Sequence, residues 1–252
     1  MAPPAPSLRP DHRTAIAMIT PSANLVVERV TNAILSDFPE VSGHFSRTPV
    51  FGSKDLFPDD YDWDGMLAAA RLLAHARPDI IVWNGSKGAN LGFPVDDALC
   101  RRIESETTIP ATTSTIALQA ALAHFQARRI AVVSPYGAAY QDKLIGRFRS
   151  EGLDVVAEAH AGIADNLDFA AMSDDAIAAM MRGVAAARPD AILSWCTNMP
   201  AAYVVDALER ELGIPILDST TLAVWHALHL TGVLDGRGRH WGRLFDILSP
   251  SQ

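Results

Sequence analysis

Cysteine, basic charge and long apolar runs are all scarce in this chain. Two cysteines, Cys100 and Cys196, occur among 252 residues. Two are too few for a disulfide framework or a cysteine-based zinc site, so we expect a reduced, cytoplasmic protein. Basic residues number 21 against 29 acidic ones, and the resulting net charge of −8 argues against a nucleic-acid partner. The apolar runs are short and interrupted by Gly, Pro or charge, which excludes a membrane span.

Several catalytic motifs are absent as well. The sequence has no Walker A motif, no G-x-S-x-G, no H-E-x-x-H and no G-x-G-x-x-G after a predicted strand. Residues 85–88 (GSKG) have the composition of a phosphate loop without its spacing. Of the histidines, His226 and His229 stand three residues apart near the end of a predicted helix, which is weak support for a metal site. We therefore expect neither a metal nor a cofactor.

Enough apolar residues are present for a packed core. They make up 49% of the chain, against 20% charged residues, which excludes disorder over most of its length. The first residues (MAPPAPSLRPDHR) are rich in proline and lack the apolar stretch of a signal peptide. We predict a flexible tail over residues 1–13.

Short β-rich runs alternate with amphipathic segments along the chain. This alternation predicts βαβ units and mostly parallel sheets flanked by helices, an α/β fold. The expected strands are 15–20, 43–50, 79–83, 109–112, 129–134, 154–159, 191–195 and 214–217. The expected helices are 23–36, 63–76, 95–106, 115–125, 138–151, 174–187, 201–212 and 220–232.

The chain also repeats itself once. Three matches occur in the same order at offsets of 105 to 114 residues: ARPDII at 76–81 with ARPDAI at 187–192, IP…ST at 109–115 with 214–220, and MITP at 18–21 with VVSP at 132–135. The repeat predicts two pseudo-symmetric α/β halves, 14–127 and 128–232, followed by a C-terminal segment, 233–252. Ligands of such sheets bind beyond the carboxyl ends of the strands, so we expect a cleft between the halves.

One strand end differs between the two halves. The offset of 111 residues aligns Gly85 in the first half with Cys196 in the second. One half therefore presents a thiol where the other presents no side chain. Cys100 lies in the middle of a predicted helix, and we interpret it as structural.

The surroundings of Cys196 leave two interpretations open with about equal weight. Cys196 directly follows a strand, Thr197 or Asn198 is suited to cap the next helix, and Pro200 suits its first turn. Amide groups at a helix start stabilise a thiolate, which predicts a thiol of near-neutral pKa able to exchange protons with carbon. The alternative is a buried structural cysteine.

Hydroxyl groups stand at several predicted strand-to-helix junctions. Singly, such groups are most often helix caps. Together with adjacent amides they predict a site for carboxylate or phosphate oxygens. Lys87 either adds positive charge to this cleft or is solvated. The hydroxyl residues are Ser22, Ser86, Thr115, Thr197, Ser219 and Thr220.

The sequence resembles the aspartate/glutamate racemase superfamily, and within it the maleate isomerases and arylmalonate decarboxylases, over residues 16–245. The resemblance rests on MITPSAN at 18–24, SPY at 134–136, ADNL at 164–167, SWCTN at 194–198 and HWGRLF at 240–245. It implies two pseudo-symmetric α/β domains with an active site between them. By the same resemblance, Cys196 and Tyr136 are catalytic, and Asn24 and Asn166 bind substrate.

The sequence departs from part of that superfamily at Gly85. Racemases and maleate isomerases have a cysteine there, whereas arylmalonate decarboxylases have glycine and keep the second cysteine alone. The resemblance thus implies that CO2 leaves from an apolar pocket and that Cys196 protonates one face of an enediolate. Trp83, Asn84 and Lys87 are typical of neither subgroup, and a lysine at this position would suit a second carboxylate.

Three functions follow from these patterns. The first is a cofactor-independent decarboxylase of a small carboxylic or dicarboxylic acid, in which Cys196 is the general acid. The second is a cis–trans isomerase of a maleate-like diacid, or a racemase-like isomerase, with an altered first catalytic position; Asn24 and Asn166 favour the maleate type, and Gly85 weighs against it. The third is a non-catalytic carboxylate-binding protein. A homo-oligomer is expected in each case. In the first, the groups that bind substrate oxygens are Ser22, Asn24, Ser86, Tyr136 and Thr197. We expect the substrate site to include Gly85, Lys87 and Asn166 as well.

Overall fold

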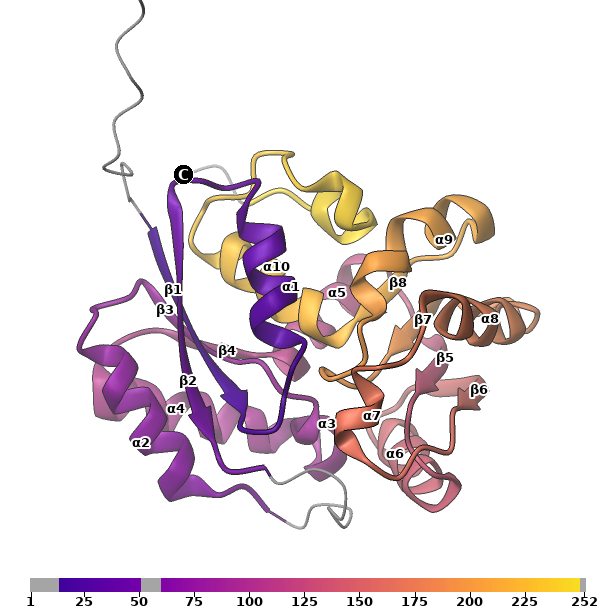
Figure 1. The fold of residues 1–252 in the computed structure, drawn as a ribbon, viewed down its shortest axis with the longest axis horizontal. Coiled ribbons are helices and arrows are strands. Elements are labelled where there is room, and N and C mark those ends of the chain that lie inside the picture. Colours follow the sequence, from indigo (N-terminus) through magenta and orange to yellow (C-terminus); the bar gives the residue numbers. More distant parts are fainter. Residues whose placement is uncertain (1–13, 51–59, 250–252) are drawn as a thin grey trace, which may run out of the picture.

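Two four-stranded sheets of the same topology form the frame of the molecule (Figure 1). The computed structural model describes residues 14–50 and 60–249; the predicted tail over 1–13 and the last three residues of the predicted C-terminal segment lie outside this part. The first sheet has the order β2-β1-β3-β4 and the second β6-β5-β7-β8, with parallel pairing throughout both. The strands are β1 (Thr14–Pro21), β2 (Val41–Thr48), β3 (Ile80–Trp83), β4 (Ala111–Thr113), β5 (Arg129–Ser134), β6 (Asp154–His160), β7 (Ala191–Ser194) and β8 (Ile216–Asp218).

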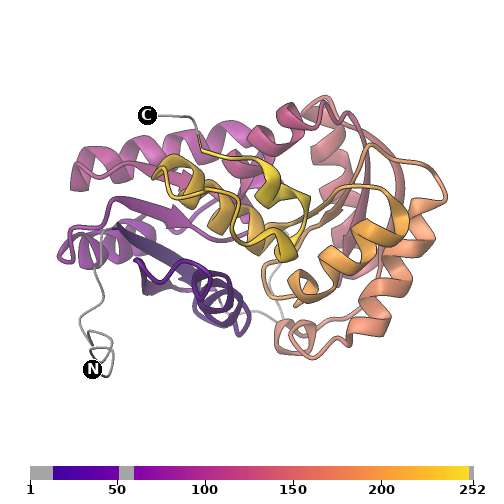
Figure 2. The same ribbon diagram turned by 90° about the horizontal axis from the view of Figure 1, so that it is seen from above.

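The predicted α/β fold with two pseudo-symmetric domains is confirmed. The two halves lie next to each other, and each sheet is flanked by helices (Figure 2). The helices are α1 (Val27–Leu35), α2 (Trp63–Ala74), α3 (Lys87–Leu91), α4 (Phe93–Thr107), α5 (Ser114–His124), α6 (Ala138–Ser150), α7 (Asn166–Phe169), α8 (Asp174–Ala185), α9 (Val205–Leu212) and α10 (Ser219–Leu230). Short 3-10 helices are η1 (Ala201–Val204), η2 (Arg239–Trp241) and η3 (Arg243–Asp246).

The repeated ARPD sequence has a structural cause. Asp79 and Asp190 stand at the start of equivalent strands, and their carboxylates accept backbone N–H groups of Ala15 at 2.8 Å and Arg129 at 2.8 Å, respectively. The preceding Arg77 and Arg188 both have positive φ, 51° and 50°. Each copy of the motif thus turns the chain out of a helix and anchors the start of the neighbouring strand, β1 in the first half and β5 in the second.

Side chains of the first sheet alternate between two apolar cores. Ala17, Ile19, Ile81 and Trp83 face the core that contains α2 and α4 residues, whereas the alternate residues of these strands join a larger core that extends through the second half. Helix α10 follows the last strand of the second half but contacts α1, α5, β3 and β4. The larger core therefore continues across both halves.

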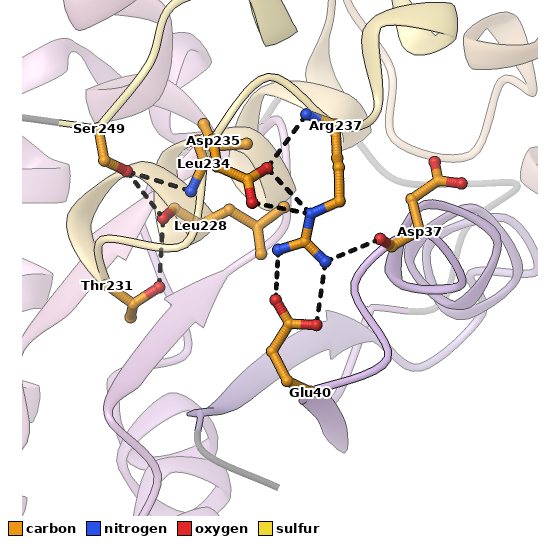
Figure 3. Close-up of polar contacts among 8 residues, drawn as sticks. All are labelled: Asp37, Glu40, Leu228, Thr231, Leu234, Asp235, Arg237 and Ser249. Atoms are coloured by element: carbon orange, nitrogen blue, oxygen red, sulfur yellow. Dashed lines mark hydrogen bonds and ion pairs between the residues drawn. The ribbon is translucent and has the colours of Figure 1, made fainter. Parts of the chain in front are cut away.

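The C-terminal segment joins the halves away from the strand ends. Arg237 forms ion pairs with Glu40 and Asp235, and it also donates to the carbonyl of Asp37 at 3.2 Å (Figure 3). On the second half, the buried carboxylate of Glu209 accepts the backbone N–H of Arg243 at 2.6 Å. Among the described residues, none of the helices is long and apolar enough to cross a membrane.

Four helical segments differ clearly from the sequence prediction. The helix expected from residue 23 begins at Val27, because the Asn24 side chain accepts the N–H groups of Val26 and Val27, both at 2.8 Å. The helix expected over 201–212 opens as the 3-10 helix η1 before α9. The short helices α3 and α7 were not predicted, since four or five residues are too few for a periodic pattern.

Candidate active site

A cavity of about 240 Å³ lies between the halves, at the carboxyl ends of β1, β3, β5 and β7. This volume suits a small organic acid better than a drug-sized ligand. The first half contributes Pro21, Asn24, Val50, Trp83, Ser86 and Lys87 to its walls. The second half contributes Tyr136, Tyr140, Ile163, Asn166, Phe169, Cys196, Thr197 and Asn198, together with small residues of the adjoining loops.

Cys196 is placed in this wall by a tight turn directly after β7. Its side chain is 4% exposed, and its carbonyl accepts the N–H of Met199 at 3.0 Å. The N–H groups of Asn198 and Met199 also point at the sulfur. No regular helix starts here, because η1 begins at Ala201 and has no side-chain cap. The predicted capping by Thr197 or Asn198 is therefore wrong, although backbone amides do face the thiol.

Burial dominates the acidity of this thiol. Desolvation raises the pKa of Cys196 to about 11, and hydrogen bonds from Tyr136 and from the N–H groups of Asn198 and Met199 offset only part of the effect. The expected near-neutral pKa is therefore wrong. Near neutral pH the sulfur carries its proton, so the group is suited to give a proton rather than to take one.

A relay of hydroxyl groups leads to the sulfur. The Ser86 and Tyr136 hydroxyls are 3.3 Å apart, and the Tyr136 hydroxyl is hydrogen-bonded to the Cys196 sulfur. Burial raises the pKa of Tyr136 well above 10. The phenol therefore keeps its proton near neutral pH and acts as a donor to a thiolate or to a substrate oxygen.

Carboxamide groups tie the two halves together beside the cavity. Asn24 Nδ2 donates to Thr197 Oγ1 at 3.2 Å, and the N–H of Leu25 donates to Asn198 Oδ1 at 2.8 Å. Asn198 Nδ2 in turn donates to the carbonyl of Asn166 at 2.6 Å. These bonds hold Asn24, Asn166 and Thr197 in place among the residues that line the cavity.

Two residues predicted to bind substrate lie outside the lining of the cavity. Ser22 is exposed, and its hydroxyl exchanges hydrogen bonds of 3.1 and 3.0 Å with the backbone of Val50. Gly85 is buried behind Trp83, and the tryptophan contributes to the wall instead. The predicted residues that do line the cavity are Asn24, Ser86, Lys87, Tyr136, Asn166, Cys196 and Thr197.

Four aromatic residues line the cavity, and the sequence analysis did not single out two of them, Tyr140 and Phe169. The ring centroid of Tyr136 is 4.2 Å from that of Tyr140 and 5.6 Å from that of Phe169. Tyr140 stands four residues after Tyr136, so helical spacing from the known tyrosine was an available signal. Phe169 belongs to the short helix α7, for which the sequence carries no periodic signal.

The charge of the lining is sparse and positive. Lys87 is the one Lys, Arg, Asp or Glu among the described lining residues. Within residues 14–50 and 60–249, no three His, Cys, Asp or Glu side chains gather where they could hold a metal ion. His226 is buried, its Nδ1 is 2.8 Å from Thr112 Oγ1, and burial lowers its pKa to about 4. An anionic ligand matches this cavity best.

The chain shares its sequence and architecture with known enzymes. The sequence profile described as arylmalonate decarboxylase matches residues 48–245. The maleate isomerase of Nocardia farcinica is 26% identical over 244 residues, covering 89% of this chain and 94% of the relative. The arylmalonate decarboxylase of Bordetella bronchiseptica is 25% identical over 239 residues, covering 92% and 96%, respectively. These relatives are enzymes of the isomerase and decarboxylase kind, which supports an enzyme here.

Solved structures agree on the fold. A cysteine-to-alanine variant of the maleate isomerase Iso from Pseudomonas putida S16, determined with maleate, superimposes with a TM-score of 0.81. The superposition covers 92% of this chain and 97% of that one at 21% identity. The profile match spans well over half of the sequence, and the superfamily resemblance is thereby confirmed. The chain belongs to the arylmalonate decarboxylase family.

Proposed function

We propose that this protein is a cofactor-independent decarboxylase of a small dicarboxylic acid, which protonates one face of an enediolate-like intermediate. The observation that carries the proposal is the pairing of a single protonated thiol, Cys196, with an apolar wall at Trp83. Among the described lining residues there is no second thiol and no carboxylate. One proton donor on one side of a carbon atom suits a reaction that forms one C–H bond.

Substrate oxygens would be held by the donors that line the cavity. Ser86 and Asn24 of the first half and Tyr136 and Thr197 of the second half line the cavity with hydroxyl and carboxamide groups. Donors fixed in a water-poor site stabilise developing negative charge more strongly than water does. Lys87, the charged group of the lining, would hold a second carboxylate and so favour a diacid over a simple monoacid.

Loss of CO2 leaves the electron pair of the broken C–C bond on the substrate as an enediolate. Cys196 then gives its proton to the carbon, and the bond electrons remain on sulfur as a thiolate. The Tyr136 hydroxyl and the N–H groups of Asn198 and Met199 stabilise this thiolate. Water returns the proton to sulfur after product release, which closes the cycle with no net change in the enzyme.

Turnover in deuterated water tests the proposal. A panel of substituted malonates is followed by NMR and by CO2 release. Decarboxylation gives one CO2 and one new C–D bond per product, with deuterium on a single face. Absence of CO2 from the whole panel, with the protein folded and ligand bound, would exclude the decarboxylase.

A cis–trans isomerase of a maleate-like diacid is the second candidate. Asn24 and Asn166 both line the cavity, and a maleate isomerase is among the relatives with matched sequence. Isomerisation conserves mass, so the same experiment with maleate distinguishes the two reactions. Thermal stabilisation by diacids without turnover of any of them would instead indicate a carboxylate-binding protein.

A further inference from the structure

The space beside Gly85 is already occupied. An ideal Cβ built at residue 85 would lie 2.2 Å from Trp83 Cζ2, 2.4 Å from Cε2 and 2.7 Å from Cη2. Carbon atoms that are not bonded to each other do not approach so closely. Glycine is therefore required at position 85 by the indole of Trp83, two residues earlier in the same chain.

The indole is held in place from the opposite side. Trp83 is buried, and its Nε1–H donates to the Tyr61 hydroxyl at 3.0 Å. Tyr61 in turn donates to the buried carboxylate of Asp96, which also accepts from Thr113 at 2.8 Å. The Tyr61 ring packs edge-on against the indole, with centroids 6.0 Å apart. Moving the ring away from residue 85 would break this buried chain of hydrogen bonds.

The second half distributes its side chains in the opposite way. At the offset of 111 residues, Trp83 corresponds to Ser194 and Gly85 to Cys196. Ser194 is small and donates to Asp218 at 3.3 Å, away from the following turn, which leaves room for the thiol. A large residue stands two positions before the glycine in the first half, and a small residue stands two positions before the cysteine in the second.

We propose that Trp83 is a specificity-determining residue: its indole fills the volume of a side chain at position 85 and closes that face of the cavity with an apolar ring. No acid or base at residue 85 then reaches the substrate, and proton transfer is confined to the Cys196 face. The indole N–H is committed to Tyr61, so the ring itself offers neither a proton nor a base. The stereochemical part rests on the proposed function, whereas the steric part stands on the geometry alone.

Four variants test the inference: Gly85→Cys, Trp83→Leu, the double variant Trp83→Leu/Gly85→Cys, and the control Gly183→Cys. Leucine lacks all three ring atoms that crowd residue 85. Gly183 is exposed on α8 with open space around its Cα, so a cysteine there meets no neighbour. The readouts are the thermal midpoint, the alkylation rate of the introduced thiol by peptide mapping, and the enantiomeric excess of the product.

We expect Gly85→Cys to lower the midpoint by about 5 °C, because the extra atoms are forced into a filled core. In the Trp83→Leu background, Gly85→Cys should lower the thermal midpoint by less than about 2 °C. The effects of the two substitutions are then clearly not additive. The double variant should also alkylate faster than Gly85→Cys and give a product of reduced enantiomeric excess. Two thiols then stand on opposite faces of the carbon, and either of them can give its proton to the enediolate.

The inference is overturned if Gly85→Cys alone keeps the parent midpoint and its thiol reacts as fast as in the double variant. Trp83→Phe/Gly85→Cys replaces the leucine pair if the latter fails to fold. Should no variant release CO2 from any substrate, the proposed decarboxylation falls, while the midpoints and alkylation rates still decide whether Trp83 occupies the position.

Discussion

The ends of β3 and β7 make equivalent backbone hydrogen bonds but carry side chains of different chemistry. After β3, the N–H of Asn84 donates to Ile19 on β1 at 3.0 Å; after β7, the N–H of Trp195 donates to Val133 on β5 at 2.9 Å. From there the side chains diverge into an apolar wall in the first half and a thiol in the second. The duplicated fold thus keeps the backbone hydrogen bonds at the cavity, while the side chains that line the cavity differ between the halves.

The buried carboxyl groups near the two strand ends also differ in their hydrogen-bond partners. Asp96 lies under the first and Asp218 under the second, both buried carboxyls whose pKa burial raises, that of Asp218 to about 6. Asp96 supports the aromatic pair of Tyr61 and Trp83, whereas Asp218 accepts from Ser194 and caps α10. Asp96 thus holds the tryptophan of the first half through Tyr61, whereas Asp218 holds Ser194, two residues before the thiol.

The largest difference between the halves should appear when the thiol is removed. Cys196→Ala deletes the proposed proton donor, and we expect kcat for decarboxylation to fall by about 10³-fold, within the range for loss of a general acid. Ligand binding, measured by thermal shift, should persist. Cys100→Ala is the matched control, because Cys100 is buried in α4 away from the lining. If Cys196→Ala turned over substrate as fast as the parent, the end of β7 would supply no proton donor and would not differ in catalytic role from the end of β3.

A smaller loss is expected when the hydroxyl beside the thiol is removed. Tyr136→Phe keeps the ring that packs on Tyr140 and Phe169 but deletes the donor to Cys196. We expect kcat to fall by about 10- to 100-fold, since one donor to a developing charge is lost. Tyr203→Phe, an exposed position on η1, is the control. Equal rates for the two variants would contradict a role for the Tyr136 hydroxyl.

The decline of kcat at alkaline pH, the alkaline limb of the pH profile, should report the pKa of Cys196 in the second half. Burial raises the pKa of Cys196 to about 11. A general acid works while it is protonated, so kcat should be flat through neutral pH and decline only as pH approaches 11. Steady-state rates measured on a substrate that does not itself titrate in this range give the limb. A decline centred near pH 7 would mean that the thiol ionises as a nucleophile and not as a buried acid.

The fold was predictable from the sequence because its signals are local or repeated. Apolar runs such as those of β5 and β7 stand out in the sequence, and the ARPD repeat places Asp79 and Asp190 at equivalent strand starts. The alignment of Gly85 with Cys196 likewise needed only the offset between the halves. These features depend on residues close together in the chain or on one constant spacing.

The parts of the site that escaped prediction depend on contacts between distant segments. The pKa of Cys196 is raised chiefly by burial, which depends on how distant segments pack together and which no local pattern encodes. Ser22 carries the right chemistry, but the chain returning through Val50 takes up its hydroxyl. Trp83 was visible as an unusual residue, yet its direction is fixed by Tyr61, from a segment 22 residues earlier.

The smallest effect on the pH profile is expected from Asp218, the buried carboxyl beside the end of β7. Asp218→Asn removes a buried charge near Cys196, and the repulsion between Asp218 and the thiolate is one cause of the raised thiol pKa. The alkaline limb should therefore move to lower pH, by less than about one unit. The equivalent cap in the first half is the uncharged Thr113, which accepts the N–H of Ile116 at 3.1 Å, so Thr113→Ser is the matched control with no shift.

Stability adds a second readout for the same variant. Burial raises the pKa of Asp218 from 3.8 to about 6, so the folded state binds this proton more tightly than the unfolded chain. The contribution favours folding below pH 3.8 and is lost as pH rises through 6, by at most about 3 kcal/mol. Asp218→Asn should abolish that part of the pH dependence in urea titrations between pH 4 and 6. The plots of unfolding free energy against pH for variant and parent could instead stay parallel between pH 4 and 6, with no movement of the alkaline limb. Asp218 would then act only as the cap of α10, and the pKa of Cys196 would be set by burial and by Tyr136.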